Sequence, residues 1–101
     1  MINSRMIGLA HSIITMVAKL NNIDRSELTG KKRDRNTTRA RHIAQWLIRK
    51  DTNLTLCQIA EIFNRDHASV MYGINKIQSE IDQDGETKFL FLDEEIEKEK
   101  L

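Results

Sequence analysis

The sequence predicts an all-α domain built as a helix-turn-helix bundle, and three observations favour this fold. Apolar residues recur at three- and four-residue steps through most of the chain, which is the spacing of a helix face. No segment alternates apolar and polar residues as a half-buried strand would. Two helical patterns meet across roughly three residues around position 64, as in a helix-turn-helix. With 101 residues, the chain is long enough for one domain with a modest core.

The N-terminal part predicts one long helix, a short helical turn and a loop. The apolar face of the long helix comprises Met6, Leu9, Ala10, Ile13, Met16, Val17 and Leu20. Asn21 and Asn22 break this pattern, and residues 24–28 add one further helical turn that ends at Gly30. Residues 31–36 are polar and basic without periodicity, which predicts an exposed loop.

A second long helix follows, with Asn36 or Thr37 as its expected N-cap. Its core stripe comprises Ala40, Ile43, Ala44, Leu47 and Ile48. Residues 51–53 mark its end. A short helix then opens at Thr55, because Thr55 and Gln58 have the spacing of a capping box.

The last long helix is expected to start directly after a tight turn. Asn64 tolerates a left-handed backbone and is the expected turn residue, and Asp66 is a strong N-cap with Ser69 at the N3 position. The inner face of the helix comprises Val70, Met71, Ile74, Ile77 and Ile81. Gly85 ends the pattern, so the expected domain covers residues 1–85. Residues 86–101 form an acidic tail or a short C-terminal helix.

Charge is unevenly distributed, although the formal net charge is only +1. Residues 31–50 contain eight basic residues and one acidic residue, Asp34, whereas residues 80–101 contain nine acidic residues and three lysines. Because salt screens charges beyond ~10 Å, the local basic density matters more than the total, and it favours a nucleic-acid partner. A solvated basic loop balanced by an acidic tail is the plain alternative. A tail that folds onto the loop and inhibits binding is another.

Composition also limits the other classes of function. Cys57 is the only cysteine, which excludes a disulfide framework, and no pair of His or Cys residues has metal-ligand spacing. No apolar run approaches the ~20 residues that span a bilayer, and the N-terminus lacks the features of a signal peptide. We therefore expect a cytoplasmic protein with no metal, no cofactor and no membrane contact. Cys57 is expected to pack or to make a groove-side contact, Trp46 to pack at a helix edge, and His11 to lie at the surface.

The start of the last long helix carries groups that suit DNA bases. In a helix-turn-helix, the first residues of the second helix meet base edges. Asp66 can accept from an exocyclic amine, His67 can donate or accept, and the Ala68 methyl can pack on a thymine methyl, while Ser69 can bond a base or a phosphate. Helix capping alone explains Asp66 and Ser69, but it does not explain an exposed Arg65 beside His67.

Residues 65–70 (Arg-Asp-His-Ala-Ser-Val) resemble the Arg-Asp-His-Thr-Thr-Val signature of the C-terminal DNA-binding domain of the bacterial replication initiator DnaA. Residues 28–33 resemble the short helix and basic loop of that family, and residues 39–47 resemble its Ala-Arg-x-Ile-Ala-x-Tyr-Leu helix. Residues 52–59 are similar to its Leu-Thr-x-x-Ser-Leu-x-x-Ile-Gly run. The resemblance spans roughly residues 10–82 and implies a Trp-repressor-like helix-turn-helix fold.

The resemblance implies a role for each matching position. Arg33 would enter the minor groove and Leu56 would touch a thymine methyl. The residues expected to read bases at the helix start are Asp66, His67, Ala68 and Ser69. The residues expected on phosphates are Lys31, Lys32, Arg35, Arg41, His42, Arg49, Arg65 and Tyr72. The implied partner is double-stranded DNA with a DnaA-box-like site, in replication initiation or its regulation at the nucleoid, and a replication protein is a further candidate partner.

Two departures from the family pattern bear on specificity. The family has two glycines between its Phe and Arg, where this chain has only Asn64, so the turn is one residue shorter and the helix could rotate. Ala68 replaces a threonine and removes one hydroxyl, which should shift the preference at one base.

The chain also lacks the Gly-x-x-x-x-Gly-Lys-Ser/Thr loop, so we expect no nucleotide binding and no enzymatic activity. It is either an excised domain of an initiator or, as we favour, a free-standing protein. Such a protein could compete with the initiator, mark a phage or plasmid origin, or regulate transcription. The alternative is a protein-interaction module or transcription regulator that retains the helix-turn-helix without the DnaA-box specificity.

Overall fold

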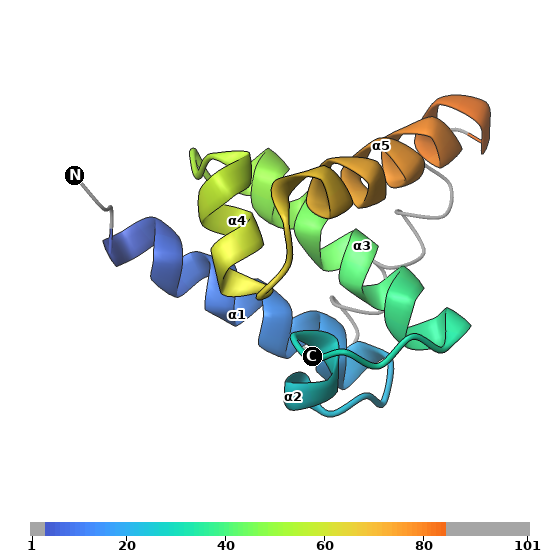
Figure 1. Cartoon of the computed structure of the whole chain (residues 1–101), viewed down its shortest axis with the longest axis horizontal. Coiled ribbons are helices and arrows are strands. Elements are labelled where there is room, and N and C mark those ends of the chain that lie inside the picture. Colours follow the sequence, from blue (N-terminus) through green and yellow to red (C-terminus); the bar gives the residue numbers. More distant parts are fainter. Residues whose placement is uncertain (1–3, 85–101) are drawn as a thin grey trace, which may run out of the picture.

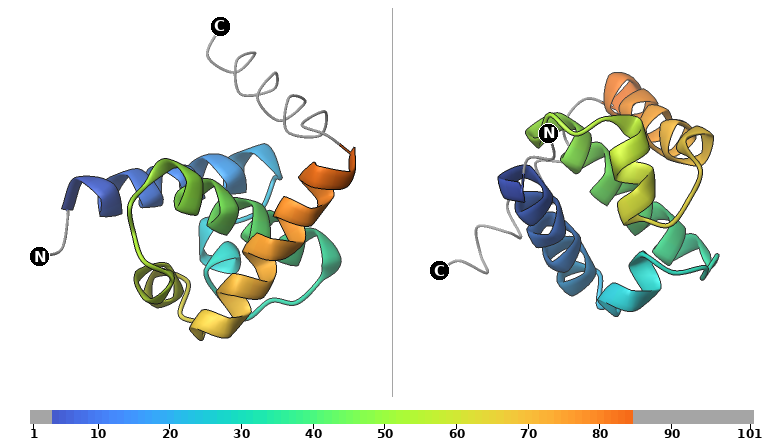
Figure 2. Two further views of the ribbon diagram at one scale, coloured as in Figure 1. Left: turned by 90° about the horizontal axis from the view of Figure 1, so that it is seen from above. Right: turned by 60° about the vertical axis from the view of Figure 1, so that its left-hand side comes forward.

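The computed structural model describes residues 4–84, which form five helices and no strand (Figure 1). The helices are α1 (Ser4–Leu20), α2 (Arg25–Leu28), α3 (Arg35–Asp51), α4 (Leu56–Ile62) and α5 (His67–Asp84). α3 runs through the middle of the bundle and contacts each of the other four helices, most extensively α5 (Figure 2). The expected all-α fold is therefore confirmed. The expected end at Gly85 and the acidic segment 86–101 lie outside the described residues.

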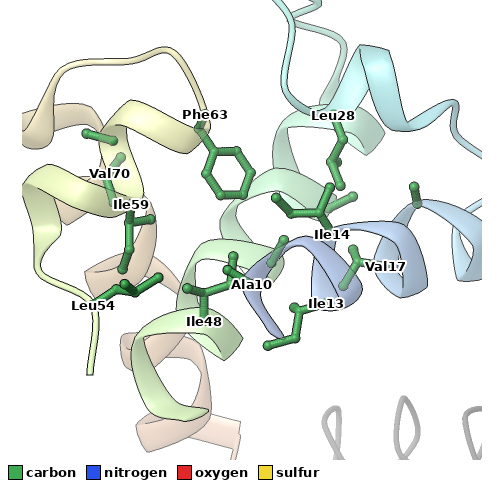
Figure 3. Packing of buried hydrophobic residues seen from close by; sticks show 14 residues of the cluster. Ala10, Ile13, Ile14, Val17, Leu28, Ile48, Leu54, Ile59, Phe63 and Val70 are labelled. Carbon is green, nitrogen blue, oxygen red and sulfur yellow. The ribbon is translucent and has the colours of Figure 1, made fainter. Parts of the chain in front are cut away.

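The core is formed by apolar side chains from all five helices and from the segments that join them. Figure 3 shows Phe63, Ile59 and Leu54 facing the same interior as Ile14 and Leu28. The fully buried members with the largest side chains include Phe63, Ile14, Leu28, Ile48, Leu54, Ile59, Ile77, Val17 and Val70. Within the described part of the chain, no helix is long and apolar enough to cross a membrane.

The expected core stripes are correct at most positions and wrong at two. Leu9 is 39% exposed and Met71 is 42% exposed, whereas Ile14 is fully buried. Leu9 lies at the edge of the α1 stripe, whose centre follows Ala10, Ile14 and Val17. Met71 follows the buried Val70 by about 100° around α5, which turns it away from α3.

The N-cap of α3 is Asp34, so the expectation of Asn36 or Thr37 is wrong. The Thr37 amide donates to Asp34 Oδ2 at 3.1 Å. Hydrogen bonding by the Thr37 side chain, and next by this amide, lowers the pKa of the Asp34 carboxyl. Thr37 itself is buried inside the first turn. The helix therefore starts earlier than expected and includes Arg35, which carries part of the basic region onto α3.

The helix-turn-helix consists of α4, the turn at residues 63–66 and α5. The capping box at the start of α4 is confirmed by Thr55 and Gln58, whose side chains each accept from the other's backbone amide. Asn64 has φ of 54°, as expected of the turn residue. The Arg65 amide donates to the Ala60 carbonyl at 2.9 Å and the Asn64 amide to the Glu61 carbonyl at 3.2 Å, which is a Schellman closure. A single left-handed residue is sufficient to make this turn.

Gly73 allows α5 to lie unusually close to α3. A Cβ atom at Gly73 would lie 2.4 Å from His42 Cδ2 and 2.7 Å from Gln45 Oε1 on the facing helix. Both separations are far below ordinary van der Waals contact. The missing side chain thus sets the spacing between the two helices that form the site described next.

Candidate nucleic-acid interface

The first turn of α5 presents a polar, solvent-exposed surface. Asp66, His67 and Ala68 are exposed, and Ser69 is half-buried. Asp66 Oδ1 accepts from the Ser69 amide at 2.9 Å, so the expected cap is confirmed. A polar, capped and uncovered helix start is the geometry with which a recognition helix meets base edges.

A basic groove lies beside this helix start, between α3 and α5. Two adjoining cavities, of about 500 Å³ and 360 Å³, make up the groove, and Arg33, Thr38 and His42 line both of them. The remaining side chains that line one cavity or the other are Arg35, Arg39, Arg41, Gln45, Arg65, Ser69, Tyr72, Lys76, Ile77 and Glu80. We call this surface the α3–α5 groove. It brings most of the expected phosphate-binding residues into one continuous basic surface.

The positive charge of the groove acts on the pKa of His42. The pKa of His42 lies below its ordinary value because the ring is partly buried and because Lys76, Arg41 and Arg65 are close. Glu80 opposes this shift only weakly. At the far end, the carboxylate of Glu80 accepts from Arg39 Nη1 at 2.8 and 2.9 Å. Several cations thus meet at His42, and a phosphate placed there would be attracted by all of them.

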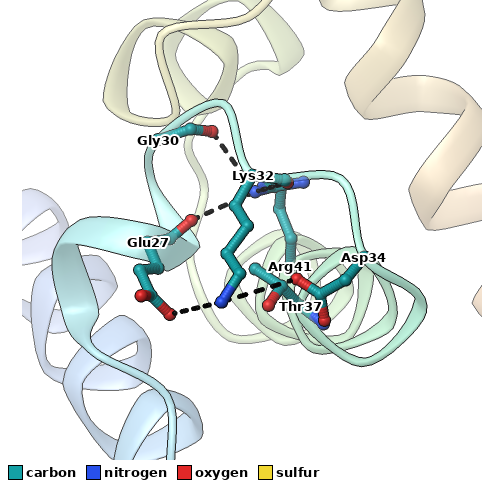
Figure 4. Close-up of polar contacts among 6 residues, drawn as sticks. All are labelled: Glu27, Gly30, Lys32, Asp34, Thr37 and Arg41. Atoms are coloured by element: carbon teal, nitrogen blue, oxygen red, sulfur yellow. Dashed lines mark hydrogen bonds and ion pairs between the residues drawn. The ribbon is translucent and has the colours of Figure 1, made fainter.

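Arg41 does not have the exposed position expected of a phosphate contact. It is 2% exposed and its guanidinium points inward. Its Nε donates to the Leu28 carbonyl at 2.7 Å, and its Nη2 lies 2.8–3.2 Å from the carbonyls of Glu27, Gly30 and Lys32 (Figure 4). These four carbonyls occupy Nε and Nη2, and the side chain is almost closed to solvent. Arg41 therefore holds backbone in place, and we withdraw it from the expected phosphate contacts.

The loop that Arg41 holds and the first residue of α3 carry four of the other expected cations. Lys31, Lys32 and Arg33 are exposed, and so is Arg35 at the start of α3. Lys32 Nζ lies 3.4 Å from the Glu27 carboxylate and 3.9 Å from that of Asp34 (Figure 4). These carboxylates partly neutralise Lys32. Arg33, which lines both cavities, is the loop cation closest to the α3–α5 groove.

The remaining expected residues lie around the groove. Tyr72 is 62% exposed, and its ring packs edge-on against His42 with the centroids 6.0 Å apart. Arg65 is half-buried and donates from Nη2 to the Gly30 carbonyl at 2.9 Å. Arg49 is exposed outside the two cavities and donates to the Leu54 carbonyl. Leu56 is half-buried against the core, which leaves only part of its side chain for a base.

Three smaller expectations concern Cys57, Trp46 and His11. Cys57 is a free, exposed thiol, so its expected packing role is wrong. Only the alternative, a contact on the side that faces the DNA groove, remains. Trp46 is half-buried and donates to Gln78 Oε1 at 2.9 Å, in agreement with a place at the helix edge. His11 is exposed as expected and contacts Arg25. Among residues 4–84, no group of three or more His, Cys, Asp or Glu residues could hold a metal ion.

Two groove residues, Lys76 and Arg39, were not expected from the sequence. Lys76 lies four residues after Tyr72 and seven after Ser69, which places all three on one face of α5. Its ammonium lies 5.9 Å from the centroid of the Tyr72 ring. Helical spacing from the recognised signature would have been sufficient to find Lys76. Arg39 lines the groove and pairs there with Glu80 of α5, a partner 41 residues away in the chain.

Comparison with known proteins agrees with this geometry. The family model described as "Bacterial dnaA protein helix-turn-helix" matches residues 10–77. The chain is 37% identical over 83 residues to the chromosomal replication initiator protein DnaA of Roseiflexus castenholzii, a match that covers 81% of this chain and 17% of the relative. It is 41% identical over 78 residues to the same protein of Neisseria meningitidis, covering 76% of this chain and 15% of the relative. The chain thus spans less than a fifth of the length of these relatives. With these matches, the chain belongs to the bacterial DnaA helix-turn-helix family.

Proposed function

We propose that this chain binds double-stranded DNA in a sequence-specific manner, at sites like the DnaA box, in replication initiation or its regulation. One observation carries the proposal: the exposed, capped start of α5 lies beside a continuous basic groove. A duplex seated on this surface would place base edges at His67 and Ala68, and phosphates along the groove. The nucleoid would then be its place of action. The match to replication initiators supports this assignment.

The base-reading part of the proposal rests on the first turn of α5. Asp66 Oδ1 is used by the cap, and Oδ2 is the oxygen that would accept from a cytosine or adenine amine. His67 would add a hydrogen bond, Ala68 a methyl contact, and Ser69 a bond to a base or phosphate. Leu56 would contribute its exposed part to a thymine methyl.

The phosphate-binding part rests on the groove and the loop. Arg35, His42, Arg65, Tyr72 and Lys76 line the groove or its rim. The residues that would add phosphate contacts outside it are Lys31, Lys32 and Arg49. Arg33 would enter the adjacent minor groove, where the negative potential of a narrow A·T-rich tract favours a guanidinium.

The test begins with selection of binding sites from random-sequence duplex, followed by titration of the selected duplex and a scrambled one. We expect the selected site to be preferred, and His67→Ala to cost about 1–3 kcal/mol on that site while changing scrambled duplex little. Lys76→Ala should weaken both duplexes alike and reduce the slope of log K against log salt by about 0.9.

Lys50→Ala is the matched control for Lys76→Ala. Both lysines are exposed, and each ammonium lies over an aromatic ring, at 5.2 Å from Trp46 and 5.9 Å from Tyr72. Only Lys76 lines the groove, so Lys50→Ala should leave affinity and salt slope unchanged. Equal affinity for selected and scrambled duplex would refute the specificity, and absence of duplex binding at low salt would favour a protein-interaction module instead.

A further inference from the structure

The basic loop, residues 29–34 between α2 and α3, has little hydrogen bonding of its own to hold its shape. Two of its backbone carbonyls, together with two from the end of α2, gather around the side chain of Arg41. The guanidinium donates to the carbonyls of Glu27 and Leu28 in α2 and to those of Gly30 and Lys32 in the loop. The path of the loop up to Arg33 is therefore set by a residue on α3.

A second arginine reaches the same loop from the helix-turn-helix. Arg65, in the turn before α5, donates from Nη2 to the Gly30 carbonyl at 2.9 Å, and Arg41 Nη2 lies 3.2 Å from the same oxygen. One carbonyl thus joins the loop, α3 and the start of α5. Gly30 itself has no room for a side chain, because a Cβ there would lie 2.7 Å from the Ser26 carbonyl.

The contact between the Arg41 guanidinium and the backbone carbonyls suits a role in positioning the loop better than a role in stabilising the fold. Arg41 is buried among neutral carbonyls and beside the like charge of Arg65, and burial is the main cause that lowers its pKa to about 10. It stays protonated near neutral pH, so a buried charge is retained here without a buried carboxylate. A planar guanidinium with donors in fixed directions can hold several carbonyls at once, which an ammonium cannot reproduce.

We propose that Arg41 is a positioning residue that, together with Arg65, sets the place of Arg33 relative to the recognition helix. The inference rests on the proposed function, because it assigns Arg33 to the minor groove and α5 to the adjacent major groove. Reading both grooves at once requires a fixed distance between the two readers. Fixing the loop in the free protein also removes the conformational entropy that would otherwise be lost on binding.

A double-mutant cycle between Arg41→Lys and Arg33→Ala tests the inference on the selected duplex. If Arg41 acts through Arg33, Arg41→Lys should weaken binding about tenfold in the wild-type background and less than about twofold when Arg33 is already alanine. The double variant should also keep the salt slope of Arg33→Ala. Additive effects with a further drop of about 0.9 in the slope would show an independent phosphate contact and overturn the inference.

Arg65→Lys provides a second variant in case Arg41→Lys does not fold, since Arg65 is only half-buried. Because Arg65 is itself a proposed phosphate contact, this variant is assessed by hydrogen exchange and not by the cycle with Arg33→Ala. Hydrogen exchange of the Thr29 and Gly30 amides, which are bonded to the Arg25 and Glu27 carbonyls, gives a measurement without DNA. Exchange at both amides should be faster in either lysine variant. Unchanged exchange would overturn the inference even if DNA binding held, and faster exchange would support it even if the chain bound no duplex.

Discussion

We predict that Gly73→Ala makes the protein less stable than Gly8→Ala does, although both changes introduce the better helix former. Gly73 is buried in α5, and a Cβ there would lie 2.4 Å from His42 Cδ2 and 2.7 Å from Gln45 Oε1. Gly8 lies exposed in α1, and a Cβ there would meet nothing within 4 Å. The two sites therefore share the gain in helix propensity but differ in packing.

The cost of overpacking at Gly73 is expected to exceed the gain in helix propensity. Gly→Ala in a helix interior stabilises by up to about 1 kcal/mol. Forcing an extra carbon into a packed contact costs about 1–3 kcal/mol. We expect Gly8→Ala to raise the free energy of unfolding by roughly 0.5–1 kcal/mol, and Gly73→Ala to fall about 1–3 kcal/mol below it.

Urea and thermal unfolding followed by circular dichroism measure both variants. In a domain of this size, 1 kcal/mol corresponds to a shift in Tm of about 4–8 °C. Repeating Gly73→Ala in a His42→Ala background should recover part of the loss, because the nearest clashing atom is gone. Equal stabilisation by the two alanines would refute the close approach of α5 to α3.

Two further predictions concern the turn and the groove. Asn64→Gly should leave stability unchanged or raise it by a few tenths of a kcal/mol, whereas Asn64→Ala should lower it by about 1 kcal/mol in urea unfolding, because alanine at φ of 54° is strained; an equal response to both would show that the left-handed backbone does not matter. The pKa of His42 is lowered in the folded protein from an ordinary value of 6.5, so the unfolded chain binds a proton at higher pH than the folded one. The free energy of unfolding should therefore fall as the pH drops through 6.5 toward the folded pKa, and His42→Gln should remove this part of the dependence; a pH profile that is unchanged in His42→Gln would contradict the burial of the neutral ring.

The features that could be predicted from the sequence are those that depend on near neighbours in the chain. The Thr55–Gln58 capping box and the Asp66 cap each join groups three residues apart, so the residue types alone specify them. The left-handed Asn64 is likewise a local preference. The wrong prediction of the α3 N-cap has the same origin. Aspartate, asparagine and threonine all suit an N-cap, and Asp34, Asn36 and Thr37 stand close together in the chain.

The orientation of Arg41 could not be predicted in the same way. Arginine is almost never fully buried unless it is paired, so the residue type argued for an exposed position. Arg41 nevertheless lies on the buried stripe of α3, between Thr37 and Ala44 at helical spacing. Its acceptors are carbonyls of α2 and the loop, 9–14 residues away, and these gather only in the folded chain. Lys76 differs, since its helical spacing from Tyr72 was already present in the sequence.

The resemblance to the family implies a turn before α5 that is one residue shorter, but this difference does not by itself change how the recognition helix is placed. Both hydrogen bonds of the Schellman closure form with Asn64 as the single left-handed residue. The most extensive contact of α5 is with α3, where Gly73 sets the approach, and α4 contributes less. The turn therefore has to permit a position that α3 determines. It follows that a changed base preference in this chain should be sought first at the exposed Ala68, where the resemblance implies that alanine replaces threonine, before it is sought at Asn64.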